Sequence, residues 1–197
     1  MKHRSSYENL VRLRDKPCFT AAEARKAGVH PSLLSYYVKK GLLQRLGRGV
    51  YMEPNATTPV SFQWEELIRI AMSVPNGVVC LISALSYYEL TDELPRKHWI
   101  AIPHGTTAPK RKEVRFIRMR NMSLGNAQEK IGPFSFQIFD RERTIIDAFR
   151  YLSREIAIKS LKAYFDAKGH KPDIRKIKEY AKKLRVPITP YLLTVTT

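Results

Sequence analysis

Cysteine, acidic residues and long apolar segments are all scarce in this sequence of 197 residues. Its two cysteines, Cys18 and Cys80, lie far apart and form no CxxC pair, which argues against a disulfide framework and a structural zinc site. We expect both to be buried free thiols. No apolar run reaches about 18 residues and the polar start is not a signal peptide, so we expect a soluble, cytoplasmic protein without a membrane partner.

The shortage of acidic residues leaves a strongly basic chain. Lysine and arginine number 35 against 18 aspartate and glutamate, for a formal net charge of +17 and a pI of about 10.0. Such a charge is typical of a protein that binds a polyanion, with nucleic acid as the leading partner. Basic residues concentrate in residues 1–55, in Arg96–Arg120 and in Arg141–Arg185, and each of the last two stretches is either a solvated face or a surface for phosphates.

Catalytic patterns are also missing. A metal-dependent nuclease needs carboxylates on adjacent strands, and the strands expected at His98–Pro103 and Val114–Met119 carry none, which leaves Glu113 without a partner. We therefore expect a protein that is not an enzyme and uses no metal and no cofactor. Two alternatives remain: a winged-helix protein with a restriction-like nuclease domain, and an RNA-binding factor. For the second, Phe134, Phe136 and Tyr51 are better explained as core than as RNA-stacking aromatics.

The pattern of turn residues predicts two domains. Glu53–Pro59 is polar, contains two prolines and has no periodicity, so we place a winged helix-turn-helix domain at 1–55 and a second domain at 60–197. The second domain is expected to have an α+β fold with a small sheet and several helices. Its helices are predicted at 62–74, 83–90, 141–152, 156–167 and 173–184, and its strands at 98–103, 114–119 and 134–139.

The strongest motif is FTAAEARKAGVHPSLLSYYVKKGLLQRLGRGVYM, Phe19 to Met52. Thr20 and Glu23 form a capping box for a helix that begins at about Ala21, and Gly28 ends it in the left-handed conformation. Pro31 suits the first position of a second helix, which ends before Gly41. Two short helices joined by a tight turn predict a helix-turn-helix.

The second helix of this motif has an apolar and a polar face. Leu34, Tyr37 and Val38 are expected to continue into Leu42 and Leu43 and to pack on Ala22, Ala24 and an earlier helix. The opposite face and the following hairpin, whose tip is Gly47-Arg48-Gly49, predict contacts with base edges and phosphates. The predicted DNA-binding residues are Ser32, Ser35, Tyr36, Lys39, Lys40, Arg45 and Arg48, with Lys110, Arg111, Lys112 and Arg115 as possible further contacts.

With these residues the sequence resembles the AbiEi-type antitoxins of bacterial type IV toxin-antitoxin and abortive-infection systems, which act in phage defence. The resemblance also covers ISALSYYELTDELP at Ile82–Pro95 and IFDRERTIIDAFRYL at Ile138–Leu152. In the second segment Asp140 is expected to cap a helix, with Arg141 and Arg143 outside and Glu142 and Asp147 solvated. Relatives often have a His-Gly-type pair where this chain has Tyr88-Glu89.

The resemblance implies a transcriptional autorepressor that binds inverted repeats in double-stranded DNA at its own promoter. It also implies an antitoxin that opposes a neighbouring nucleotidyltransferase-like toxin, with no direct contact required between the two proteins. Composition and spacing by themselves predict DNA binding alone.

Overall fold

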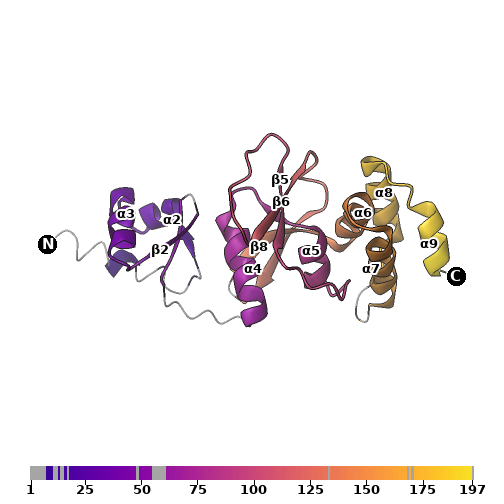
Figure 1. Ribbon diagram of the computed structural model, residues 1–197, viewed down its shortest axis with the longest axis horizontal. Helices are drawn as coiled ribbons and strands as arrows, with labels where there is room; N and C mark the ends of the chain where they lie inside the picture. Colours follow the sequence, from indigo (N-terminus) through magenta and orange to yellow (C-terminus); the bar gives the residue numbers. More distant parts are fainter. Residues whose placement is uncertain are drawn as a thin grey trace. The chain divides into compact units, whose positions relative to one another are not determined.

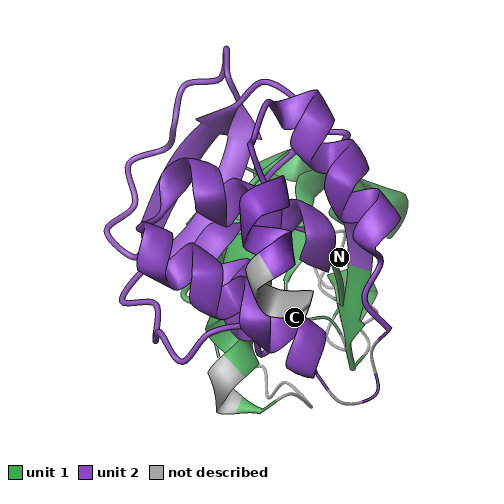
Figure 2. Cartoon of the chain, turned by 90° about the vertical axis from the view of Figure 1, so that its right-hand side faces the viewer, with its two compact units in different colours: residues 1–75, 129–136 green, residues 76–128, 137–197 purple. Residues whose placement is uncertain are grey.

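The computed structural model contains helices and strands in both halves of the chain, which confirms the mixed α+β fold class (Figure 1). It describes residues 8–10, 13, 16, 18–47, 49–54, 61–132, 134–167, 169 and 171–196. The chain divides into two compact units, residues 1–75 with 129–136 and residues 76–128 with 137–197 (Figure 2). Among the described helices, none is both long enough and apolar enough to span a bilayer.

The described part of the first unit includes two short helices, a three-stranded antiparallel sheet and a longer helix, together with residues 129–136. The sheet has the order β1-β3-β2. The elements are β1 (Phe19–Thr20), α2 (Ala21–Lys26), α3 (Pro31–Lys39), β2 (Gln44–Gly47), β3 (Val50–Met52) and α4 (Phe62–Ser73).

Local sequence signals set the bounds of α2 and α3. The Thr20 hydroxyl accepts a hydrogen bond from the Glu23 N–H while the Glu23 carboxylate accepts one from the Thr20 N–H, so the predicted capping box is present. Gly28 has φ +86°, a left-handed conformation that glycine adopts without strain. Pro31 is the first residue of α3, as predicted.

The core of the first unit lies between α2, α3 and the sheet. Leu34 and Tyr37 of α3 are buried with Ala24 and Leu43, as the apolar pattern predicted. Two expectations were wrong: Ala22 is exposed, and Leu42 keeps 39% of its surface. The core reaches Ala21 in place of Ala22, and the chain turns after α3 at Gly41, with φ +70°, so only one of the two following leucines faces inward.

Helix α4 also packs on the N-terminal sheet. Met72 lies against a small cluster of Cys18, Val50 and Met52, with the Cys18 sulfur 3.9 Å from the Met72 sulfur. Burial raises the pKa of the Cys18 thiol to about 11, as expected for a thiol in apolar surroundings. The predicted division into 1–55 and 60–197 falls inside this compact unit, and residues 55–60 lie outside the described residues, so that division stays a prediction.

A five-stranded mixed sheet follows, with the order β6-β5-β4-β8-β7. The strands are β4 (Val78–Val79), β5 (His98–Pro103), β6 (Val114–Met119), β7 (Asn126–Ile131) and β8 (Phe134–Phe139). The three strands predicted from the sequence are confirmed, and Phe134, Phe136 and Tyr51 are buried as expected. Sequence reasoning missed β4, which has only two residues, and β7, whose sequence NAQEKI has almost no apolar alternation.

The helices of the second unit are α5 (Leu81–Tyr87), α6 (Arg141–Tyr151), α7 (Arg154–Asp166), α8 (Ile174–Leu184) and α9 (Thr189–Thr196). Figure 1 shows α6, α7, α8 and α9 gathered as a helical group, and α6 packs on α5, α7 and α8. Cys80 precedes α5 and is a buried free thiol, as is Cys18, which confirms the expectation for both cysteines.

The backbone at Glu89 concerns the pair Tyr88-Glu89, where this chain departs from the family that it resembles. Glu89 follows α5 with φ +58°, in the left-handed region that glycine occupies most easily. A glycine at this position in relatives would serve the same turn, and the neighbouring Tyr88 is buried under the Arg141 guanidinium, whose carbon is 4.6 Å from the ring centroid.

Helix α6 buries more charged side chains than the sequence analysis predicted. Asp140 caps the helix as predicted, accepting a hydrogen bond of 2.8 Å from the Arg143 N–H. The expectation that Arg143 stays outside was wrong, because its side chain is fully buried, and so was the expectation that Glu142 and Asp147 are solvated. Asp147 lies one turn after Arg143 and supplies the opposite charge, so the two ions are buried as a pair.

Glu142 joins α6 to α7 and α8. Its carboxylate accepts a hydrogen bond of 2.6 Å from the Tyr164 hydroxyl and lies 2.9 Å from the Lys176 ammonium. Burial alone would raise the pKa of Glu142, but the hydrogen bonds from Tyr164 and Lys176 outweigh it and lower that pKa. The charged form of Glu142 therefore stabilises the packing of these three helices.

Candidate nucleic-acid interface

One face of α3 gathers four of the predicted DNA-binding residues. Ser32, Ser35, Tyr36 and Lys39 stand at helical positions i, i+3, i+4 and i+7, so their side chains share one side of the helix. All four are exposed. Tyr36 keeps 47% of its surface while Tyr37 keeps 3%, which confirms the prediction from helical phase that Tyr36 faces outward.

The N-terminus of α3 is capped by a residue that the sequence analysis did not predict. His30 caps α3: its Nδ1 accepts a hydrogen bond of 3.3 Å from the Ser32 N–H and lies 2.7 Å from the Ser32 hydroxyl oxygen. The Ser32 hydroxyl is therefore already engaged within the chain. The available signal was the pair His30-Pro31, because a polar residue directly before a proline at the first helical position is a frequent cap.

Positive charge collects at the other end of α3. Lys39 and Lys40 are exposed, and within the described part of the chain neither forms an ion pair. The Lys40 ammonium lies 5.9 Å from the centre of the Tyr36 ring. By contrast, Lys16 in the same unit is paired with Glu23. Two cations without a carboxylate partner can meet phosphates, and they also complement the negative end of the helix dipole.

The hairpin that follows α3 contains one more of the predicted DNA-binding residues. Arg45 lies on β2 opposite Tyr51 of β3, and its side chain is exposed. Gly49 has φ +73° at the turn between the two strands, where a glycine avoids strain. Arg48 lies outside the described residues, so its proposed contact stays a prediction.

The further predicted contacts belong to the second unit. Lys110 and Lys112 are exposed and Arg111 is half-buried in the segment between β5 and β6. Arg115 is exposed on β6, and its guanidinium carbon lies 4.0 Å from the ring centroid of Trp99, its neighbour on β5. Because stacking uses the face of the guanidinium, its N–H edge can still donate to a phosphate. The four residues thus lie on β6 and on the segment that precedes it.

The sequence of the segment that contains α3 matches a known family. Residues 8–54 match the family model described as "Transcriptional regulator, AbiEi antitoxin". Over these residues the chain is similar to the AbiEi regulators, and we refer to them below as the AbiEi-type domain. This match supports a DNA-binding antitoxin and transcriptional regulator, and over residues 8–54 it confirms the resemblance drawn from the sequence.

A solved structure extends the likeness beyond the AbiEi-type domain. The crystal structure of the RV2827C protein from Mycobacterium tuberculosis superposes with a TM-score of 0.58 at 13% identity. The similarity covers 91% of this chain and 70% of that protein. At this identity the comparison establishes a shared fold. A comparison with curated proteins finds no match.

The described residues contain no group of three histidine, cysteine, aspartate or glutamate side chains able to hold a metal ion. Glu113, the carboxylate considered as a candidate for a nuclease site, is exposed just before β6. The expectation of a protein without catalytic activity remains a prediction. In the AbiEi-type domain, the structure places four of the predicted DNA-binding residues on the polar face of α3 and Arg45 on β2, the strand that follows.

Proposed function

We propose that this protein is a transcriptional autorepressor and the antitoxin of a type IV toxin-antitoxin system. In this proposal the AbiEi-type domain acts as a winged helix-turn-helix, with α3 as the recognition helix and the β2–β3 hairpin as the wing. The observation that carries it is the exposed face of α3 within the segment that matches the AbiEi regulators.

Different residues on the exposed face of α3 would make different contacts with DNA. Ser35 and Tyr36 stand in the middle of α3, where short polar and aromatic side chains can reach base edges in the major groove. Lys39, Lys40 and Arg45 would contact phosphates, which fix position without reading sequence. One recognition helix reads only a few base pairs, so a long operator requires two copies on an inverted repeat.

The antitoxin role rests on the family match and on the two segments that resemble the family's second domain. The opposed toxin would be a nucleotidyltransferase-like protein encoded nearby, and the opposition would not require contact between the two proteins. Co-expression with the product of the adjacent gene tests this half: the full chain should restore growth. Continued growth arrest with a well-expressed full chain would contradict it.

Gel shifts test the DNA-binding half, with a duplex from upstream of the protein's own gene and a scrambled duplex of equal length. The full chain should prefer the upstream duplex. The S35A and Y36A variants should each reduce that preference by about tenfold, since a good base contact contributes about 1–3 kcal/mol of discrimination. The matched control is K162A, an exposed site on α7. Equal binding of the full chain to both duplexes would contradict the proposal.

The proposal assigns no reaction to the protein. Incubation with Mg²⁺ or Mn²⁺ and plasmid, RNA or nucleotides should leave each substrate intact. Turnover that disappears in the E113A variant would favour the nuclease alternative. A metal-dependent nuclease needs carboxylates on adjacent strands, and Glu113 directly precedes the strand β6.

A further inference from the structure

The second unit contains a cavity of about 420 Å³, and six of its eleven lining residues are cationic. It lies where the end of β6, the helix α6 and the end of α8 meet. Among the described residues, the lining includes His104, an asparagine, a tyrosine and two apolar side chains, but no carboxylate. Six further lining residues are cationic: Arg118, Arg120, Arg143, Arg150, Lys183 and Arg185.

These positive charges exceed the negative charges that pair with them. Asp147 lies 2.7 Å from Arg143 and 2.6 Å from Arg150, so one carboxylate serves two arginines. Glu179 pairs with Lys183 at 2.6 Å. In the described ranges Arg118, Arg120 and Arg185 form no ion pair. Six cations against two carboxylates leave four positive charges around the cavity without compensation.

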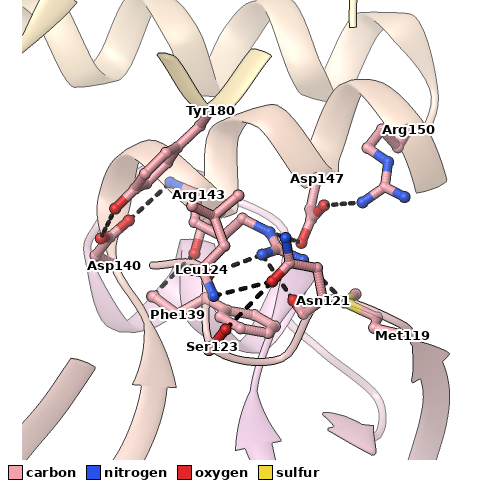
Figure 3. Close-up of polar contacts among 11 residues, drawn as sticks. Met119, Asn121, Ser123, Leu124, Phe139, Asp140, Arg143, Asp147, Arg150 and Tyr180 are labelled. Atoms are coloured by element: carbon pink, nitrogen blue, oxygen red, sulfur yellow. Dashed lines mark hydrogen bonds and ion pairs between the residues drawn. The ribbon is translucent and has the colours of Figure 1, made fainter. Parts of the chain in front are cut away.

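The deepest of these cations is held in a fixed position (Figure 3). Arg143 donates from Nη1 to the carbonyl oxygens of Asn121 and Leu124, at 3.0 and 2.7 Å, and from Nε to Asp147. Its Nη2 contacts the Met119 sulfur at 3.8 Å, a weak acceptor. A buried arginine with this much support holds its charge at one place in the cavity wall.

The rim combines cations with an exposed aromatic ring. The Arg150 guanidinium carbon lies 4.9 Å from the ring centroid of Tyr151, which is 40% exposed. Arg118, another lining residue, donates from Nε to the Thr106 carbonyl oxygen, which orients its remaining N–H groups. Planar guanidinium groups on several walls are suited to the tetrahedral oxygens of phosphates.

We propose that this cavity binds a small molecule that carries two or three linked phosphates, such as pyrophosphate or a nucleoside triphosphate. Its volume lies in the range of about 300–1,000 Å³ typical of small-molecule sites. A terminal phosphate carries about 1.5 to 2 negative charges, so a chain of two or three balances the excess better than one. The proposal does not depend on DNA binding by α3, because all lining residues belong to the second unit.

Titration calorimetry of the full chain at physiological salt tests the site, with pyrophosphate, a nucleoside triphosphate, inorganic phosphate and sulfate as probes. We expect saturable 1:1 binding of the first two, at least tenfold tighter than that of the single anions. The R118Q and R120Q variants should each weaken pyrophosphate binding by about tenfold, since a charge-assisted hydrogen bond contributes about 1.5–3 kcal/mol. Both side chains are exposed enough for the fold to survive, which the melting temperature verifies.

The matched control is R175Q, which removes an exposed arginine from the first turn of α8, away from the cavity. It should bind pyrophosphate as the unaltered chain does. An equal loss of affinity in R175Q would show that the effect comes from net charge alone and would overturn the proposal. Equal affinity for all four anions would also overturn it.

Nucleic acid is the other source of phosphate that the cavity could bind, and a random-sequence duplex added as a competitor tests it. If it displaces pyrophosphate, and R118Q and R120Q weaken duplex binding in parallel, the cavity belongs to a nucleic-acid surface and the proposal fails.

Discussion

The polar face of α3 and helix α6 place the same kinds of charged residue in opposite settings. On α3 the lysines 39 and 40 are exposed and, within the described residues, lack a carboxylate partner. On α6 Arg143 is fully buried and paired with Asp147. An exposed cation contributes little to stability and is available to a partner, whereas a buried one is part of the architecture. Lys39 and Lys40 are therefore expected to serve binding and the Arg143–Asp147 pair to serve stability, and the following substitutions test that separation.

The largest expected effect is in α6. Replacing Asp147 with Asn removes the carboxylate shared by Arg143 and Arg150 and leaves a buried guanidinium without its counter-charge. We expect the free energy of unfolding, measured in urea, to fall by about 3–5 kcal/mol. The matched control is E155Q, which breaks the Glu155–Lys159 pair of the same spacing and length, 2.7 Å, on the exposed side of α7. That control should cause no measurable change, and equal losses would contradict the contrast.

The next effect tests how closely the chain packs around Arg143. Gly125 has φ +67°, and a Cβ added there would lie 2.5 Å from the Arg143 Cβ. G125A should therefore cost more than about 2 kcal/mol, from backbone strain together with the steric clash. Gly169 has φ +78° with nothing within 4 Å, so G169A should cost only the strain, about 1 kcal/mol. Chemical denaturation of both variants measures the difference, and a similar cost at the two sites would argue against tight packing at Gly125.

The pH dependence of stability should reveal the buried Glu142. Its pKa is lowered in the fold, so its charged form stabilises the protein fully above the pKa of the unfolded chain, about 4.3. That contribution is lost as the pH falls through the lowered pKa of the folded state. The unaltered chain should therefore exceed E142Q in stability at pH 7, and the gap should narrow at pH 3. A gap that stays constant between these pH values would show that ionisation of Glu142 is not the cause.

The smallest effect on stability, with a clear effect on binding, belongs to α3. K39A should change the free energy of unfolding by less than about 0.5 kcal/mol. It should weaken binding to specific and random duplexes alike and lower the slope of log affinity against log salt by about 1. K162A has the same change in charge at an exposed site on α7 and should leave the slope unaltered. A slope that is the same in K39A and the unaltered chain would remove Lys39 from the interface.

Much of the N-terminal half could be predicted because its signals are local. The capping box at Thr20, the left-handed Gly28 and the proline that begins α3 each depend on a few neighbouring residues, and the structure places all three as expected. Helical phase alone also separated exposed Tyr36 from buried Tyr37. The exceptions, Ala22 and Leu42, lie at the edges of the apolar pattern, where a small rotation decides which neighbour faces the core.

In the second unit the positions of the main helices and strands followed from the sequence, but the roles of the charged residues did not. Arginine at position 143 and carboxylates at 142 and 147 fit a solvated helix face as well as a buried network. Their burial depends on partners far along the chain, namely the carbonyl oxygens of Asn121 and Leu124, the hydroxyl of Tyr164 and the ammonium of Lys176.

The sequence by itself determined the α+β class, the helical motif at Phe19–Met52 with its polar face, and the strong excess of positive charge. These properties follow from spacing, capping and composition, which act over a few residues or over the whole chain. Only the tertiary structure decided that six cations in or directly after β6, α6 and α8 line one cavity, and that α4 packs with the N-terminal sheet. Both depend on segments distant in sequence, whose meeting is set by the burial of apolar and paired polar surface and leaves no local pattern.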